Sequence, residues 1–296
     1  MIPEFPIFKI LELSDKEIIQ QITSRYEQHS DFNFSGAYSW DIRNKIQVSL
    51  LNDNYVMMTV DYLSGEQFLT YLGTNNVDDT TNKLLIFAKE NAIKPELKLI
   101  SQKTAQMIDR NVFDVIEDLD NFDYIVDLVE ISEYNTYKTK SRKRAINSFL
   151  KNFSPVIRQI NFIKDKELIY DLFSKCKIEG DIEESELDAV SRFMQFYENK
   201  CIISTGFFIN EELVGFCFSE VINSNVAYFH FWKAYSKISK YLYTYLMQIN
   251  AKILIDKYGC KKLNIEQDMG IQGLRKWKSS FDKTEYIKKY KVTFKK

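Results

Sequence analysis

Residues 212–259, with the sequence ELVGFCFSEVINSNVAYFHFWKAYSKISKYLYTYLMQINAKILIDKYG, decide the fold of the second half of the chain. Their first part is rich in aromatic and β-branched residues and is interrupted at Asn223-Ser224-Asn225, which predicts two strands, 212–222 and 225–234, joined by a turn. A long helix is expected over 237–258, because the next residue, Gly259, is of a type that commonly ends helices. The hairpin and helix together indicate a domain built from a sheet and helices.

The segments on either side of this stretch complete the element order of the second half. The predicted elements are a basic helix over 139–152, a strand over 155–161, helices over 165–177 and 184–199, a strand over 201–209, a strand over 261–266, a helix over 271–280 and a strand over 284–294. Hairpin, long helix, strand, helix, strand is the element order of a GNAT acyltransferase-like domain.

The first half repeats this order, although no repeat is visible residue by residue. Its predicted elements are a helix over 12–30, strands over 46–51, 54–62 and 67–72, a helix over 79–92, a strand over 97–100, a helix over 102–109 and strands over 112–117 and 123–129. We therefore expect an α/β (α+β) fold with two tandem GNAT-like (acyl-CoA N-acyltransferase-like) domains and mixed sheets. The expected bounds are 1–120 and 139–296, with a connecting strand and linker over 121–138.

The composition excludes several classes of protein. With 45% hydrophobic and 15% aromatic residues, the chain of 296 residues can bury a core and is not disordered. Four isolated cysteines exclude a disulfide framework and a zinc ribbon, and two histidines argue against a histidine-based metal site, so no metal is expected. No stretch approaches about 18 apolar residues, and the N-terminal MIPEFP lacks the features of a signal peptide. We therefore expect a cytoplasmic protein without a transmembrane segment.

The charges are segregated, although the net charge is only −1. Residues 138–158 contain seven bases and no acid, and residues 261–296 contain eleven bases and four acids. Two basic segments that are far apart in the sequence could converge on one anionic ligand, or each could be a solvated surface next to an acidic one. No DNA partner is expected.

Residues 264–278, NIEQDMGIQGLRKWK, carry a resemblance to a known family. This segment resembles the signature of the family named for the C-terminal domain of phosphatidylglycerol lysyltransferase, which runs Asn-Arg-Glu-(Glu/Gln)-Asp-(apolar)-Gly-(two)-Gly-Leu-Arg-Lys-Ala-Lys. Weaker similarities extend over nearly the whole chain. They lie at residues 32–40, 122–127, 140–144 and 186–190 and at Lys233-Ala234.

The resemblance implies a tandem GNAT-like fold and a transferase activity. Better-known members of the family move an aminoacyl group from charged tRNA to a lipid head group or a related amine or hydroxyl. The lysyltransferases also carry a membrane-embedded half, which has no counterpart in this sequence, so we expect a cytoplasmic member. Three positions depart from the family pattern: Trp232 replaces Glu, Tyr235 replaces Asp and Ile265 replaces Arg.

Two acidic residues of the signature are the expected catalytic groups. Acyl or aminoacyl transfer needs a base for the attacking amine or hydroxyl and donors for the developing oxyanion. Glu266 and Asp268 lie two residues apart at the end of a predicted strand, so they share one face while the chain is extended. Asp268 could instead cap the helix that follows it.

The remaining expected site residues bind ligand. Arg275 suits a forked contact with a phosphate or carboxylate, and the neighbouring lysines supply point charges. With the resemblance, the expected ligand-binding residues are Asn264, Arg275, Lys276, Lys278, Lys233 and Glu186. Arg142, Lys143 and Arg144 stand near the start of the basic helix, where cations are unfavourable beside the helix dipole and a phosphate would compensate. They are therefore expected to bind phosphate or RNA, unless they are simply solvated.

Three functions remain open from the sequence. The first is transfer of an aminoacyl or acyl group, with aminoacyl-tRNA or acyl-CoA as the donor substrate, to a small amine or hydroxyl; no other cofactor is expected. The second is a CoA-dependent N-acyltransferase, which the absence of glycine from residues 233–243 disfavours, because glycine lets a backbone approach a pyrophosphate. The third is a non-catalytic member that binds an anionic ligand. His230 is expected to be a core histidine, with a base that faces the site as the alternative, and Glu220 could meet it across the hairpin.

Overall fold

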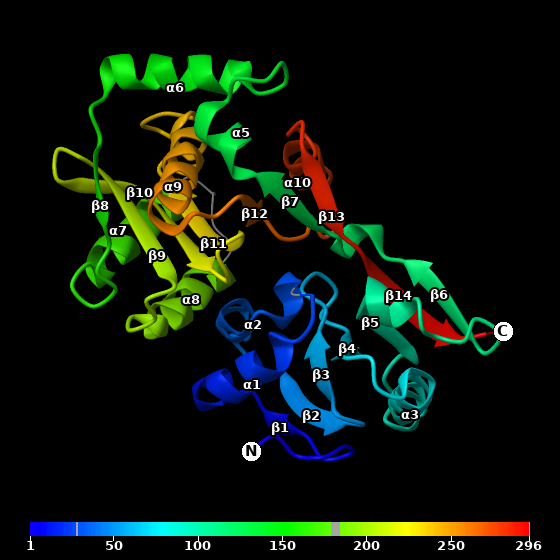
Figure 1. The fold of residues 1–296 in the computed structure, drawn as a ribbon. Coiled ribbons are helices and arrows are strands. Elements are labelled where there is room, and N and C mark those ends of the chain that lie inside the picture. Colours follow the sequence, from blue (N-terminus) through cyan, green and yellow to red (C-terminus); the bar gives the residue numbers. More distant parts are fainter. Residues whose placement is uncertain (28, 179–183, 296) are drawn as a thin grey trace. The chain divides into compact units, whose positions relative to one another are not determined.

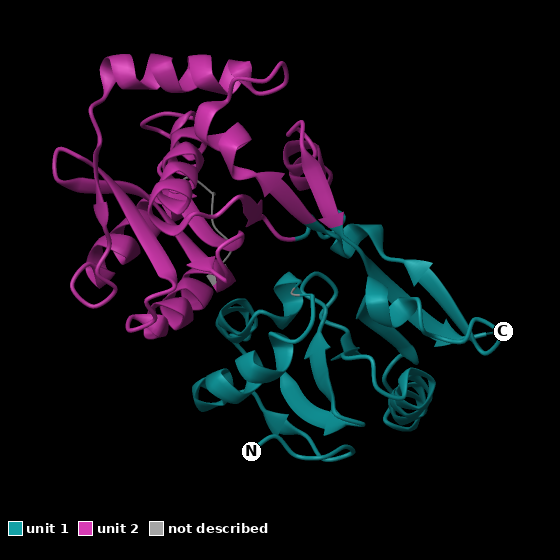
Figure 2. Ribbon diagram, in the orientation of Figure 1, with its two compact units in different colours: residues 1–123, 267–271, 287–296 teal, residues 124–266, 272–286 magenta. Residues whose placement is uncertain are grey.

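The computed structural model describes residues 1–27, 29–178 and 184–295. These fall into two compact units (Figure 2). Unit 1 consists of residues 1–123, 267–271 and 287–296, and unit 2 of residues 124–266 and 272–286. Gln28, inside the helix expected over 12–30, and residues 179–183 lie outside the described part.

Unit 1 is built on a seven-stranded sheet (Figure 1). Its strands pair in the order β1-β2-β3-β4-β5-β14-β6, and β4 and β5 run parallel. Their bounds are Lys9–Ile10 (β1), Gln47–Leu51 (β2), Asn54–Val60 (β3), Gln67–Leu72 (β4), Glu96–Ser101 (β5), Lys289–Phe294 (β14) and Phe113–Glu117 (β6).

The helices of unit 1 include one long crossover between the parallel strands. This helix, α3 (Val77–Glu90), buries Leu84 and Leu85 against Leu69 of β4 and Leu97 of β5, in a continuous apolar core. The other helical segments are η1 (Leu13–Asp15), α1 (Lys16–Thr23), η2 (Ser30–Phe32), α2 (Phe34–Trp40), α4 (Gln102–Ala105) and η3 (Leu119–Asn121). The helix expected over 12–30 is shorter, and the sequence did not predict α2.

Unit 2 repeats this plan with a second seven-stranded sheet. The strand order is β13-β7-β12-β11-β10-β9-β8, and here β11 and β12 are the parallel pair. The bounds are Thr284–Ile287 (β13), Asp123–Asp127 (β7), Lys262–Asn264 (β12), Val226–Ala234 (β11), Glu212–Val221 (β10), Ile202–Ile209 (β9) and Val156–Gln159 (β8).

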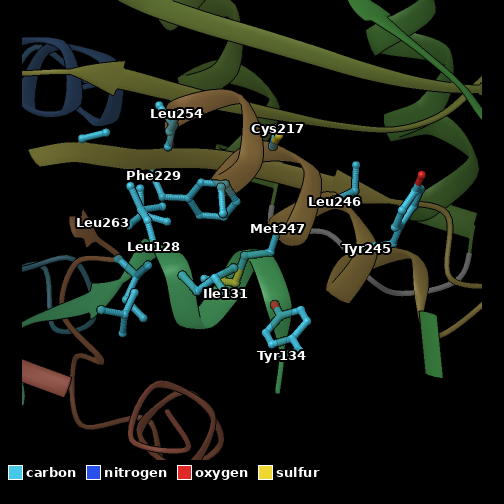
Figure 3. Close-up of a cluster of buried hydrophobic side chains, with 14 of the residues drawn as sticks. Leu128, Ile131, Tyr134, Cys217, Phe229, Tyr245, Leu246, Met247, Leu254 and Leu263 are labelled. Atoms are coloured by element: carbon cyan, nitrogen blue, oxygen red, sulfur yellow. The ribbon is translucent and has the colours of Figure 1, made fainter. Parts of the chain in front are cut away.

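Helices cover both faces of the second sheet. On one face the long helix α9 (Leu242–Tyr258) packs with α5 (Leu128–Glu133) and α6 (Lys140–Asn152); Figure 3 shows Ile131 of α5 beside Met247 of α9. On the other face, Phe173 of α7 (Lys166–Ile178) contacts Phe216 with ring centroids 6.1 Å apart, and Phe193 of α8 (Glu184–Phe193) stacks on Phe218 at 5.9 Å. The remaining helices are η4 (Met194–Phe196) and α10 (Gln272–Lys278).

The two units are GNAT-like, as the repeated element order predicted. Each sheet contains a parallel pair joined by a long helix. The units differ from the expected domain bounds, because residues 124–138 belong to unit 2 and the end of the chain belongs to unit 1. The single strand expected over 284–294 is two strands: β13 joins the second sheet, and β14 pairs with β5 and β6 in the first.

Candidate functional site

An irregularity in strand β11 positions His230. Along the antiparallel pair β10–β11, Phe218 lies opposite Phe231, while the next residue, Ser219, lies opposite Phe229. His230 is therefore the extra residue of a β-bulge. Bulges re-aim side chains and are common next to active sites.

The neighbouring strand β12 parts from β11 close to this bulge. Their parallel pairing ends with Tyr228 opposite Asn264, and the next residue of the chain, Ile265, donates its backbone N–H to the carbonyl of Tyr124 instead. Glu266 then adopts a φ of 59°, in the left-handed region that non-glycine residues rarely occupy. The side chain of Asn264 accepts a hydrogen bond from the backbone N–H of Glu266 at 2.7 Å, which stabilises this turn.

The bulge and the turn bring His230 between two carboxylates. Its Nε2 lies 3.2 Å from Oε2 of Glu220, and its Nδ1 forms an ion pair with Oε1 of Glu266 at 3.3 Å. The side chains of His230 and Glu220 are each only 2% exposed, whereas that of Glu266 is 28% exposed. Glu266 is therefore the member of this group that a substrate can reach.

The surroundings of His230 favour its charged form. Burial alone would lower the pKa of the imidazole, but hydrogen bonding and charge from Glu220 and Glu266 raise it to about 9. The raised pKa favours the imidazolium form, whose charge complements both carboxylates. We call His230, Glu220 and Glu266 the histidine–glutamate group.

A second ion pair lies on the same side of the sheet. Lys233, near the end of β11, is buried, and its Nζ donates to Oε2 of Glu186 in α8 at 2.6 Å. His230 also contacts α8, because its ring centroid lies 5.2 Å from that of Phe193. The structure thus brings together Lys233 and Glu186, two of the expected ligand-binding residues.

The other signature residues differ in exposure. Lys278 is buried, and its Nζ donates to the carbonyl of Ile265, so it supports the chain immediately before Glu266. Arg275 is half-buried and Lys276 is exposed on α10. Asp268 belongs to unit 1, is fully buried and accepts a hydrogen bond from the N–H of Gly270 at 2.8 Å. Its expected catalytic role stays a prediction.

The basic helix α6 contributes side chains of two kinds. The Arg142 guanidinium donates to Oγ of Ser280, just beyond α10, and lies 4.3 Å from the centroid of the Phe281 ring. Burial lowers its pKa from the usual value. Lys143 and Arg144 are exposed. The start of α6 therefore adjoins the end of the signature segment within unit 2, and two of its three expected phosphate-binding side chains face solvent.

Two of the departures from the family pattern lie in apolar surroundings. Trp232 packs against Trp277 and Tyr243, with ring centroids 5.0 and 5.2 Å away, and Ile265 is buried.

The sequence favoured a core position for His230 and did not predict its ion pair with Glu266. The expected contact between His230 and Glu220 is confirmed, and together with the signature residue Glu266 it was the signal in the sequence that pointed to this group.

No helix in the described part of the chain is long and apolar enough to cross a bilayer. The same residues contain no cluster of three histidine, cysteine or acidic side chains with the geometry to hold a metal ion.

Comparison with known proteins identifies the family. The family model described as phosphatidylglycerol lysyltransferase, C-terminal, matches residues 23–293. The chain belongs to this family. The kind of function that this family membership supports for the chain is aminoacyl or acyl transfer. No curated protein sequence matches the chain.

Several solved structures share the fold of this member of the lysyltransferase family. A conserved protein of unknown function from Bacteroides thetaiotaomicron is 22% identical, with a TM-score of 0.82 and full coverage of both chains. L-PGS from Bacillus licheniformis is 14% identical with a TM-score of 0.60, covering 96% of this chain and 93% of the other. FemX is 8% identical with a TM-score of 0.59 and covers 96% of each chain.

Proposed function

We propose that unit 2 transfers an aminoacyl or acyl group to a small amine or hydroxyl, and that Glu266 accepts the proton of the attacking group. The observation that carries this proposal is the partly exposed carboxylate of Glu266, which contacts the buried ring of His230 at the point where two parallel strands part. Preorganised groups of this kind accelerate a reaction because they need no rearrangement when charge develops.

The chemistry follows from the position of this carboxylate. Glu266 takes a proton from the acceptor, whose nitrogen or oxygen then forms a bond to the carbonyl carbon of the donor. The bond between that carbon and the leaving oxygen or sulfur breaks, and the proton passes to the leaving group. His230 holds the carboxylate of Glu266 in place through its Nδ1, which makes it a positioning residue.

An amine is favoured over a hydroxyl as the acceptor. The carboxylate of Glu266 is 28% exposed, so a cationic group can approach it. A carboxylate attracts the ammonium group of an amine substrate and has no such attraction for a neutral hydroxyl.

Aminoacyl-tRNA is the donor that we propose first. The exposed Lys143 and Arg144 on α6, and Lys276 on α10, offer positive charge to a polyanion. Acyl-CoA is less favoured, because the segment between β11 and α9 lacks glycine.

A comparison of donors tests this proposal. The protein is incubated with total tRNA charged with radiolabelled amino acids, and ethanolamine or glycerol is offered as a simple amine or hydroxyl acceptor. We expect label to move to an acid-soluble product, faster with the amine. The same acceptors are offered with acetyl-CoA while free thiol is measured. Transfer from acetyl-CoA alone would overturn the choice of donor, and transfer from neither donor would contradict the proposed function.

A further inference from the structure

Unit 2 contains a cavity that the proposed transfer reaction does not use. Its volume is about 360 Å³, at the lower end of the range for small-molecule sites. The cavity lies where β8 ends and β9 begins, and its wall is completed by the segment 196–200 and by Tyr258 at the end of α9.

The lining combines an apolar floor with a charged and polar rim. Ile160, Phe162 and Phe196 are buried in the floor. Glu198 and Lys200 are exposed at the rim, two residues apart, and Asn199 lies between them. One acid, one base and an apolar floor complement a molecule that carries an ammonium, a carboxylate and an apolar side chain.

A series of polar contacts connects this cavity with the histidine–glutamate group. Nδ2 of Asn199 donates to Oε1 of Glu220 at 3.3 Å, and the other carboxylate oxygen of Glu220 contacts His230, which in turn contacts Glu266. Asn199 is fixed in place because its Oδ1 also accepts a hydrogen bond from the N–H of Cys201 at 3.0 Å. The lining of the cavity therefore reaches Glu266 through three side-chain contacts.

We propose that this cavity is a second binding site, for a free α-amino acid with an apolar side chain, and that its occupant acts on the histidine–glutamate group through Asn199. The carboxylate of the ligand pairs with Lys200, the ammonium group with Glu198, and the side chain covers the apolar floor. Only the effect on transfer rests on the proposed function; the binding itself does not.

Binding is tested first, by calorimetric titration with L-phenylalanine. Two matched ligands serve as controls: phenylpropionate lacks the ammonium group, and phenethylamine lacks the carboxylate. We expect saturable binding of the amino acid only, and an affinity about tenfold lower in Lys200→Glu, since one charge-assisted contact is lost. Lys252→Glu is the control, because Lys252 is an exposed residue of α9 outside the cavity. No saturable binding, or equal affinity in both variants, would overturn the proposal.

The connection to His230 is tested by proton NMR of the imidazoles. The chain has only two histidines, His29 and His230, so a His29→Gln variant assigns both signals. L-phenylalanine should shift the His230 signal in the wild type. In Asn199→Ala it should still bind without producing that shift. An equal shift of the His230 signal in Asn199→Ala would overturn the proposed connection. The effect of Glu266→Gln on transfer activity is a separate outcome, which concerns the proposed function alone.

Discussion

Nδ1 of His230 lies 3.3 Å from Oε1 of Glu266, and Nε2 of the same ring lies 3.2 Å from Oε2 of Glu220. The imidazole is buried, so its charge is balanced by these two side chains rather than by water. A β-bulge and a left-handed residue in adjacent segments are needed to produce this arrangement. Both are locally unfavourable features that persist where the surrounding structure holds them.

Stability should fall as the pH rises through the pKa of His230. The pKa in the folded protein is raised to about 9, above the value of about 6.5 for an unperturbed histidine. The stabilisation is therefore complete below about pH 6.5 and is lost as His230 deprotonates near pH 9, for a total of roughly 3 kcal/mol. Urea unfolding at pH 6 and pH 9.5 measures this difference. His230→Gln should remove most of it, and an unchanged pH dependence in that variant would contradict the assignment.

Lys289→Met should strongly destabilise unit 1. Lys289 is fully buried, and its ammonium contacts Asp31 and Asp123, the latter at 2.6 Å. Burial would lower the pKa of Lys289, but the two carboxylates raise it. Loss of this cation leaves two buried carboxylates without their counter-charge, which costs about 3–5 kcal/mol.

The adjacent residue provides a matched control for Lys289. Lys288 forms an ion pair with Glu117 at 2.7 Å, but both side chains are at least 40% exposed. Lys288→Met should leave the unfolding midpoint nearly unchanged, because exposed ion pairs add little. Equal unfolding midpoints for the two variants in urea would show that the contacts of Lys289 do not stabilise the unit.

The basic helix should separate into residues that stabilise the fold and residues that bind a polyanion. Arg142→Ala should lower stability by about 1–2 kcal/mol, because the guanidinium packs on Phe281 and donates to Ser280. Lys143→Ala together with Arg144→Ala should leave stability unchanged, weaken tRNA binding and reduce its dependence on salt. The measurements are urea unfolding and tRNA binding at several salt concentrations. If the salt dependence of tRNA binding is unaltered in the double variant, Lys143 and Arg144 are solvated residues that do not bind the polyanion.

Most of the fold could be predicted from local patterns. The hairpin before α9 and the end of that helix at Gly259 were predicted to within a few residues, except that α9 begins at Leu242 and not at residue 237. The division at Lys288 could not be predicted. Residues 284–294 read as one strand, and only long-range pairing with β5 and β6 assigns β14 to the other sheet. Strand propensity contains no information about which sheet a strand joins.

The candidate site was predictable only in part. The signature pointed to Glu266, and the position of Asn264 beside it follows from the same segment. The sequence left His230 between a core position and a base that faces the site, because a strongly apolar strand favours a core position. It is the bulge at Ser219 and Phe229 that turns His230 toward Glu266, and no local pattern reveals a bulge of this kind.

The most direct test of the proposed mechanism is the rate of label transfer from radiolabelled aminoacyl-tRNA to ethanolamine by Glu266→Gln. Glu285→Gln is the matched control, because Glu285 is an exposed carboxylate of β13 in the same unit, paired with Lys262 outside the histidine–glutamate group. Glu266→Gln should slow transfer by about 100-fold or more while tRNA binding is unchanged, and Glu285→Gln should transfer at the wild-type rate. Transfer by Glu266→Gln within a few-fold of the wild-type rate would contradict the proposed mechanism.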